Sequence, residues 1–243
     1  MLMDGVVFLA ARTARSQAYS QALVRAGLAP ARTLLLDPGT PDVMPPRAPA
    51  APCRVAGLNV PDLGQPLATT VVQAGWTHET LPSADVNDGQ ALAALQRLQA
   101  RLLVYSGYGG QLVGDALLAL GIPFLHLHSG WLPDFRGSTT LYYSLLSGQR
   151  PAVSALVLDR GIDAGRILLR RRYPIPPRDC ELDLLYDNAI RADLLVRVLR
   201  RYLRRNGLWQ GRAQGTDAGR NYYVIHPVLK HLARLSLHAD VQA

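Results

Sequence analysis

Short apolar segments alternate with amphipathic ones along this chain, and this alternation limits its fold more than any other feature. The apolar segment Gly5 to Ala10 precedes an amphipathic segment, Gln17 to Ala26, and a second apolar segment follows at Arg32 to Leu36. Segments of this length and order are typical of a strand, a helix and a parallel strand joined by a right-handed crossover. The sequence therefore predicts an α/β fold with a mostly parallel, doubly wound sheet.

The same alternation continues through the rest of the chain. We expect further strands at Arg54 to Asn59, Arg101 to Tyr105, Ile122 to Leu127, Val153 to Leu158 and Arg166 to Arg172, and further helices at Gly64 to Ala74, Asp88 to Gln99, Gly114 to Leu120, Ser138 to Ser147 and Leu182 to Leu203. The proline-rich segment Asp37 to Pro52 is expected to be an exposed loop. Residues 1–207 then form one catalytic domain, and residues 208–243 a linker and a small, helical carboxyl-terminal element.

Composition places the chain among ordinary globular proteins. It has 243 residues, of which 49% are hydrophobic and 18% charged. No uninterrupted apolar run approaches the roughly 20 residues of a membrane span, and the first residues lack the pattern of a secretory signal. Cys53 and Cys180 form neither a metal-binding spacing nor a disulfide framework. We therefore expect a cytoplasmic protein that does not bind membranes.

The net charge of +8 raises the question of nucleic-acid binding, because clustered cations neutralise phosphates. The excess is nearly all arginine, since Lys230 is the one lysine in the sequence. The densest group, Arg197 to Arg205, lies at the end of a predicted helix, where cations interact favourably with the helix dipole. We therefore expect no nucleic-acid partner, although an anionic small substrate stays open.

Two histidines follow one predicted strand, and an aspartate follows another. His126 and His128 occupy alternate positions of a strand and so share one face. Asp163 lies between Gly161 and Gly165, after the next apolar run. If neighbouring strand ends bring these side chains into one crevice, they form a plausible acid–base group. A metal ion held by the same three side chains is an alternative.

The order of these residues resembles the folate-dependent formyltransferase family. The family signature is Asn-x-His, then Leu-Pro and a basic residue followed by Gly, and then an Asp-x-Gly loop. The matching positions are His128, Leu132-Pro133, Arg136-Gly137 and Asp163-Ala164-Gly165. His126 stands where the family has asparagine. The likeness extends over about residues 100–172.

The resemblance implies transfer of a formyl group from 10-formyltetrahydrofolate to an amine, in biosynthetic one-carbon metabolism. Because few residues follow Gly207, we expect a small acceptor, such as an amino sugar nucleotide or an amino-acid-derived metabolite. His128 would donate to the oxyanion that forms on the formyl group, and Asp163 would support His128 and accept the proton of the amine. His126 would keep the role of the amide donor, change the pH optimum, or mark a different acyl donor.

The resemblance also implies residues that bind the two substrates, and no metal. For the formyl donor they are Tyr105, Gly107, Tyr108, Gly109, Leu158, Gly161 and Ile162. For the acceptor they are Ser129, Arg136 and Thr139. Arg136 has an alternative role in pinning its own loop, and Thr139 in capping the next helix. Four polar residues of the long predicted helix could form an acceptor-binding face, although we favour a solvated face; they are Tyr186, Asp187, Asn188 and Arg191.

Three other functions remain open from the sequence. A hydrolase of the same fold would use water in place of the amine. A non-catalytic module would bind folate or a nucleotide without turnover, and a metal-dependent hydrolase would use His126, His128 and Asp163 as ligands. The apolar carboxyl-terminal element offers a surface for pairing with a second copy of the chain.

Overall fold

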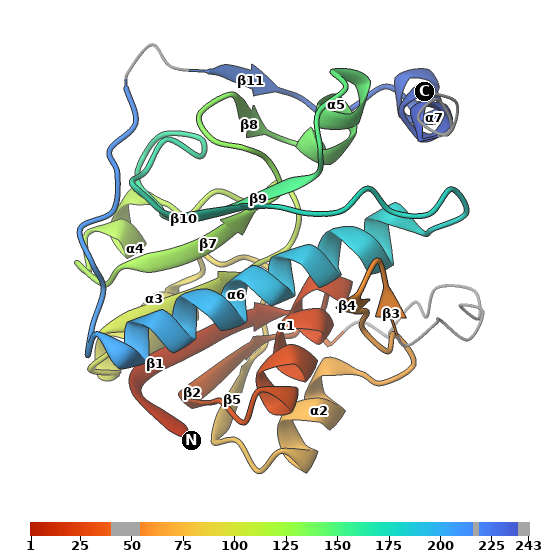
Figure 1. Cartoon of the computed structure of the whole chain (residues 1–243). Coiled ribbons are helices and arrows are strands. Elements are labelled where there is room, and N and C mark those ends of the chain that lie inside the picture. Colours follow the sequence, from red (N-terminus) through yellow and green to blue (C-terminus); the bar gives the residue numbers. More distant parts are fainter. Residues whose placement is uncertain (40–53, 216–218, 238–243) are drawn as a thin grey trace.

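One seven-stranded sheet forms the centre of this computed structural model, which describes residues 1–39, 54–215 and 219–237 (Figure 1). Across the sheet the order is β10 (Ile167–Arg172), β9 (Ala152–Val157), β7 (Phe124–His128), β6 (Leu102–Ser106), β1 (Leu2–Ala11), β2 (Ala29–Leu36) and β5 (His78–Leu81). All pairs from β7 to β5 are parallel, whereas β9 runs antiparallel to both β7 and β10. The expected α/β fold with a mostly parallel sheet is confirmed.

Helices cover both faces of the sheet. They are α1 (Ala14–Arg25), α2 (Leu67–Gln73), α3 (Gly89–Arg97), α4 (Asp115–Leu118), α5 (Thr140–Leu146), α6 (Asp187–Arg204), which continues a π-helical turn at Leu182–Tyr186, and α7 (Pro227–Ser236). In Figure 1, α1 and α6 lie in front of the sheet and α3 lies behind it. Among the described residues, no helix is both long and apolar enough to cross a membrane.

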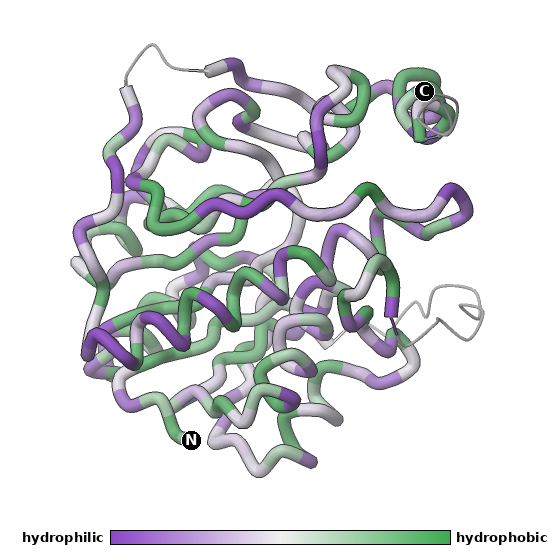
Figure 2. Tube along the Cα trace, in the orientation of Figure 1, coloured by the Kyte–Doolittle hydropathy of each residue, from purple (hydrophilic) through white to green (hydrophobic). Residues whose placement is uncertain are grey.

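The alternation of side chains along β7 decides where its histidines point. Leu125 and Leu127 belong to the apolar cluster that α1 and α6 form with the sheet, whereas Phe124 belongs to the cluster on the α3 side. Because successive side chains of a strand point to opposite faces, His126 and His128 lie on the same face as Phe124. Figure 2 shows the strands as mainly hydrophobic and the last turns of α6 as mainly hydrophilic.

The segment after α6 returns to the loop that follows β7. Here β11 (Arg220–Tyr222) pairs in parallel with β8 (Phe135–Gly137), and α7 packs against α5. The approach is so close that an added Cβ at Gly219 would lie 1.6 Å from the carbonyl oxygen of Pro133. The carboxyl-terminal element is therefore bound directly to the segment that carries the histidine motif.

Some sequence-based expectations for the first hundred residues differ from the structure. The strand expected at Arg54 to Asn59 is instead a hairpin of β3 (Arg54–Val55) and β4 (Leu58–Asn59), because Ala56 and Gly57 adopt positive φ angles that reverse the chain. The edge strand β5 was not expected, because its residues are mostly polar and half exposed. Most of the loop expected at Asp37 to Pro52 lies outside the described residues.

Replacing Gly165 with alanine is expected to destabilise the fold. An added Cβ at Gly165 would lie 1.8 Å from the carbonyl oxygen of Val157, so the backbone of β9 would have to move. We expect a loss of about 1–3 kcal/mol in the free energy of unfolding, measured by urea denaturation. The matched control is Gly89→Ala in the first turn of α3, where nothing lies within 4 Å. Equal stability of the two variants would contradict the packing at Gly165.

Candidate active site

His128, at the end of β7, is buried and has a protein partner at each ring nitrogen. Its Nε2 atom lies 2.6 Å from the carbonyl oxygen of Phe135, and its Nδ1 atom lies 3.1 Å from Oδ2 of Asp163. A carbonyl and a carboxylate both accept hydrogen bonds, so each contact requires a ring N–H. A ring with both protons satisfies both contacts, but burial lowers the pKa of His128 below its ordinary value, so near neutral pH a ring with one proton donates to one of the two acceptors.

Asp163 reaches His128 from the loop between β9 and β10. Because β9 is antiparallel to β7, Val157 at the end of β9 lies opposite Leu125 near the start of β7. The chain therefore leaves β9 near the amino-terminal end of β7. Asp163 adopts a φ of 48°, and its Oδ2 atom accepts a hydrogen bond of 2.9 Å from the backbone N–H of Gly137. The histidines and the aspartate thus meet, although not at the carboxyl ends of neighbouring parallel strands as the sequence suggested.

His126 has no hydrogen bond at either ring nitrogen to the described residues. Its Nε2 atom lies 4.0 Å from Oδ1 of Asp163, which is too far for a direct hydrogen bond. Its Nδ1 atom is buried without a partner in the described part of the chain. An atom that hydrogen-bonds to both Nε2 of His126 and Oδ1 of Asp163 would have to approach them from one side, because 4.0 Å is too short for an atom to lie directly between them.

Burial and nearby cations keep His126 neutral. Burial lowers the pKa of His126 to about 3; Asp163 opposes this shift, while Arg15 and Arg191 add to it. Burial also lowers the pKa of His128, and again Asp163 opposes the shift. Burial alone would raise the pKa of Asp163, but the two imidazoles bring it below its ordinary value. Asp163 is therefore ionised, and His128 gains a second proton only below its ordinary pKa, although this carboxylate favours that proton.

Two arginines fix the backbone around the histidines. The guanidinium of Arg191, on α6, donates to the carbonyl of Leu127 at 2.7 Å and to Oδ2 of Asp187 at 2.9 Å. Arg15, in the first turn of α1, donates to the carbonyl of Gly107. The interpretation of this part of α6 as a solvated face was wrong, because the side chains of Arg191 and Asp187 are only 15% and 17% exposed.

Neither arginine could be assigned from the sequence alone. Arg15 lies more than a hundred residues before the motif and belongs to no recognisable pattern. Arg191 lies four residues after Asp187, a spacing that exposed helix faces also use. Their positions become visible only once the helices are placed against β6 and β7.

Three of the residues expected to bind the formyl donor lie in one apolar cluster. Tyr105, Tyr108 and Leu158 all belong to or pack against the cluster on the α3 side of the sheet. The Tyr105 ring lies 6.2 Å from that of His126, and its hydroxyl is buried without a partner in the described residues. The other expected donor-binding residues are the glycines and Ile162, which belong to the adjoining turns. The carbonyl of Gly107 accepts a hydrogen bond from Arg15, and the N–H of Gly161 donates to Asp159. Gly109 and Ile162 are exposed.

Of the residues expected to bind the acceptor, two contact the segment after α6. Arg136 is buried, and its guanidinium donates to Oε1 of Gln214. Thr139 adopts a φ of 52°, and its hydroxyl accepts a hydrogen bond from the backbone N–H of Ile225 rather than capping α5. The third, Ser129, donates its hydroxyl proton to Asp187.

A small cavity of about 130 Å³ adjoins His128. Thr140 connects the two, because its hydroxyl lies 3.4 Å from Nε2 of His128. Hydroxyl and carboxylate groups dominate the lining, which consists of Ser129, Thr139, Thr140, Leu141, Tyr142, Asp183, Asp187 and Arg191. Such a lining suits a ligand group that carries several hydroxyls.

His126, His128 and Asp163 are the one group in the described ranges whose ligand atoms lie close enough together to hold a metal ion. These atoms are up to 4.8 Å apart, whereas ligands of a tetrahedral zinc ion are separated by roughly 3.4 Å. The positive charges of Arg15 and Arg191 act on the same imidazoles and oppose a cation. The geometry therefore favours proton transfer and hydrogen bonding over metal binding.

Comparison with known proteins gives consistent matches. A family profile described as formyl transferase matches residues 59–193. The methionyl-tRNA formyltransferase of Synechococcus sp. (strain JA-3-3Ab) is 34% identical over 115 residues, which cover 46% of this chain and 35% of that protein. The chain thus spans about a third of the length of this curated relative.

Solved structures share the fold at low sequence identity. A sugar N-formyltransferase from Shewanella sp FDAARGOS_354 aligns with 97% of this chain and 89% of its own, with a TM-score of 0.56 and 17% identity. Glycinamide ribonucleotide transformylase 1 from Symbiobacterium toebii aligns with 87% of this chain and 93% of its own, with a TM-score of 0.57 and 18% identity.

The low pKa of His126 predicts a specific pH dependence of stability. Below pH 6.5 the unfolded chain protonates this histidine, whereas the folded chain does so only near pH 3, so stability falls as the pH decreases through that interval. Between pH 7.5 and 5, wild type should lose about 2 kcal/mol more than His126→Asn. Urea denaturation at both pH values measures this difference. The exposed residue His231 provides the control. If His231→Asn reduced the pH dependence of stability as much as His126→Asn does, the effect could not be assigned to His126.

Proposed function

This chain belongs to the formyl transferase family, and from that membership we propose that it transfers a formyl group from 10-formyltetrahydrofolate to the amine of a small acceptor in the cytoplasm. The observation that carries the proposal is the 4.0 Å space between Nε2 of His126 and Oδ1 of Asp163. A neutral imidazole N–H on one side and a carboxylate on the other suit a carbonyl oxygen and an amine, respectively.

The reaction needs one proton acceptor and one oxyanion donor. The amine nitrogen attacks the formyl carbon, and negative charge develops on the formyl oxygen. As the new carbon–nitrogen bond forms, Asp163 accepts the proton of the amine. The bond to the donor nitrogen then breaks, and that nitrogen takes the same proton. The ionised state of Asp163 supports this role.

We assign the oxyanion contact to His126 instead of His128. Both ring nitrogens of His128 are engaged, by Phe135 and by Asp163, whereas Nε2 of His126 has no hydrogen bond to the described residues. A neutral imidazole presents one N–H, as the amide of the family's asparagine does. His128 then acts as a positioning residue that orients Asp163 and holds a proton beside it.

Binding of the formyl donor would involve the turns after β6 and β9. Tyr105, Tyr108 and Leu158 supply an apolar wall, and Gly109 is exposed in the turn after β6. The buried Tyr105 hydroxyl has no partner among the described residues, so a polar atom of a bound ligand would satisfy it. These features suit a molecule with a flat heterocycle and polar edges, such as a folate.

The cavity beside His128 supports an acceptor that carries hydroxyl groups. Its lining offers the hydroxyls of Ser129, Thr140 and Tyr142 and the carboxylates of Asp183 and Asp187. An amino sugar, or its nucleotide, presents hydroxyls next to an amine, and a solved structure of the same fold is a sugar N-formyltransferase. An amino-acid-derived metabolite would use fewer of these groups.

Hydrolysis of the formyl donor is the second candidate function. A water molecule that hydrogen-bonds to both His126 and Asp163 from one side could take the place of the amine, and Asp163 could deprotonate it. Formate release that needs no amine would identify the hydrolase.

Single substitutions should distinguish the proton acceptor, Asp163, from the oxyanion donor, His126. With 10-formyltetrahydrofolate and a panel of amino sugars and amino acids, Asp163→Asn should lower kcat by about 10²- to 10⁴-fold. His126→Ala, which removes the oxyanion donor, should lower kcat by about 10²- to 10³-fold. His126→Asn should retain most of the activity because an amide N–H replaces the imidazole N–H.

The outcome of His126→Asn decides the assignment of the oxyanion donor. An inactive but folded His126→Asn variant would show that the imidazole has a role that an amide cannot fill. Wild-type activity in Asp163→Asn would contradict the proposed proton transfer.

The cavity predicts a specific effect on acceptor binding. Tyr142→Phe removes a hydroxyl that lines the cavity and donates to Asp183 at 2.7 Å. The KM for the acceptor should rise about 3- to 10-fold, as expected for one hydrogen bond, while the KM for the formyl donor stays constant. Tyr143→Phe is the matched control on the same helix, because Tyr143 does not line the cavity. Equal effects of the two variants would exclude this cavity as the acceptor site.

A further inference from the structure

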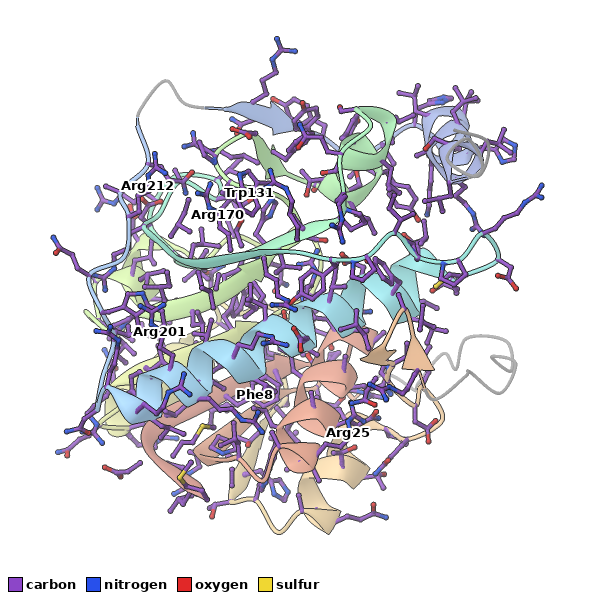
Figure 3. The ribbon with its side chains drawn as sticks, in the orientation of Figure 1. Phe8, Arg25, Trp131, Arg170, Arg201 and Arg212 are labelled. Atoms are coloured by element: carbon purple, nitrogen blue, oxygen red, sulfur yellow. The ribbon has the colours of Figure 1, made fainter. Side chains whose placement is uncertain are left out.

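A second, larger cavity lies on the surface between α1, α6 and the β3–β4 hairpin. Its volume is about 460 Å³, within the range of pockets that hold small-molecule ligands. Five arginines line it, together with one acidic residue; the arginines are Arg25, Arg54, Arg171, Arg197 and Arg200. We call this cavity the arginine groove. Arg25, on its α1 side, is labelled in Figure 3.

Among the residues that the structure describes, few negative charges compensate the arginine groove. Asp193 is the acidic residue of the lining, and it pairs with Arg197 at 2.7 Å and with Arg171 at 3.7 Å. Arg54 donates to the carbonyl of Gly57, which carries no charge. Arg25 and Arg200 have no hydrogen bond or ion pair with any residue that the structure describes. Like charges that converge without counterions repel each other, so an anion would stabilise this arrangement.

The arginine groove is separate from the candidate active site. On α6, Asp193, Arg197 and Arg200 follow each other at spacings of four and three residues and so share one face. Asp187 and Arg191, which contact the active site, also lie one turn apart, but about 80–180° around the helix from the groove residues at about 100° per residue. The helix therefore presents the two sites on different faces.

The floor of the groove consists of small and apolar side chains. Ala22 and Ala26 come from α1, Ala189 and Ala192 from α6, and Ala56 from the hairpin. Short side chains leave a shallow apolar surface beneath the arginine rim. A flat ring can lie on such a surface, while guanidinium groups at the rim bind phosphate oxygens in pairs.

We propose that the arginine groove binds a phosphorylated small molecule of nucleotide size, with its phosphates between Arg25 and Arg200 and its ring system on the alanine floor. Phosphate is favoured over a single carboxylate because several guanidinium groups converge on the groove while only one carboxylate does. This site is independent of the formyl donor and acceptor sites, so the proposal goes beyond the formyl transfer proposed above.

Titration of the protein with ADP, pyrophosphate and adenosine tests the proposal. Isothermal titration calorimetry should show one saturable site for ADP, weaker binding of pyrophosphate and no binding of adenosine. Arg25→Ala and Arg200→Ala should each weaken ADP binding about tenfold, and raising the salt concentration should weaken it further. The melting temperature of each free variant, compared with wild type, verifies that it is folded.

Two control variants make the result specific. Arg204→Ala makes the same charge change on an exposed position of α6 outside the groove and should leave the affinity unchanged. His126→Asn alters the active site and should leave ADP binding intact. The proposal is overturned if ADP does not bind, if Arg204→Ala weakens binding as much as Arg200→Ala, or if His126→Asn abolishes it. Adenosine or pyrophosphate binding as tightly as ADP would likewise overturn the assignment of a nucleotide.

Discussion

The two hydrogen bonds of the His128 imidazole join three separate parts of the chain. One ring nitrogen contacts the carbonyl of Phe135 in β8, the other contacts Asp163 in the β9–β10 loop, and the residue itself belongs to β7. Asp163 in turn accepts the N–H of Gly137, which lies two residues after Phe135. Both partners are hydrogen-bond acceptors, whereas burial lowers the pKa of His128, so a ring with one proton donates to one partner and a second proton is needed to satisfy both. The geometry of the site and its protonation are therefore coupled.

Replacement of the family's asparagine by His126 fits this electrostatic setting. An imidazole in water would be partly protonated near neutral pH, and a positively charged His126 ring would compete with His128 for Asp163. Burial, Arg15 and Arg191 remove that competition by keeping His126 uncharged. The substitution thus preserves a neutral N–H donor next to the carboxylate, although the shape of the donor differs.

Much of the fold could be predicted from the sequence because it depends on local pattern. Apolar strands alternate with amphipathic helices; the histidines lie at the end of an apolar strand, and the aspartate lies in the loop after another. The direction of β9 could not be predicted, because the pattern of apolar residues is the same for a parallel and an antiparallel strand. Arg15 was missed as part of the site, and a solvated face was favoured for Asp187 and Arg191, because the contacts of both arginines include backbone carbonyls far away in the sequence. Those contacts exist only after α1 and α6 pack on the sheet.

The pairing of β11 with β8 has a consequence for how this protein is made. Arg136 bonds to Gln214, Gly137 pairs with Tyr222, and Thr139 binds Ile225, so residues after α6 hold the segment that carries Phe135. During synthesis, the sheet and α6 leave the ribosome before these partners do. A nascent chain that has reached only Gly207 contains both histidines and the aspartate but lacks the strand that holds β8. The contacts that hold β8 therefore form only after residues 214–225 have been synthesised.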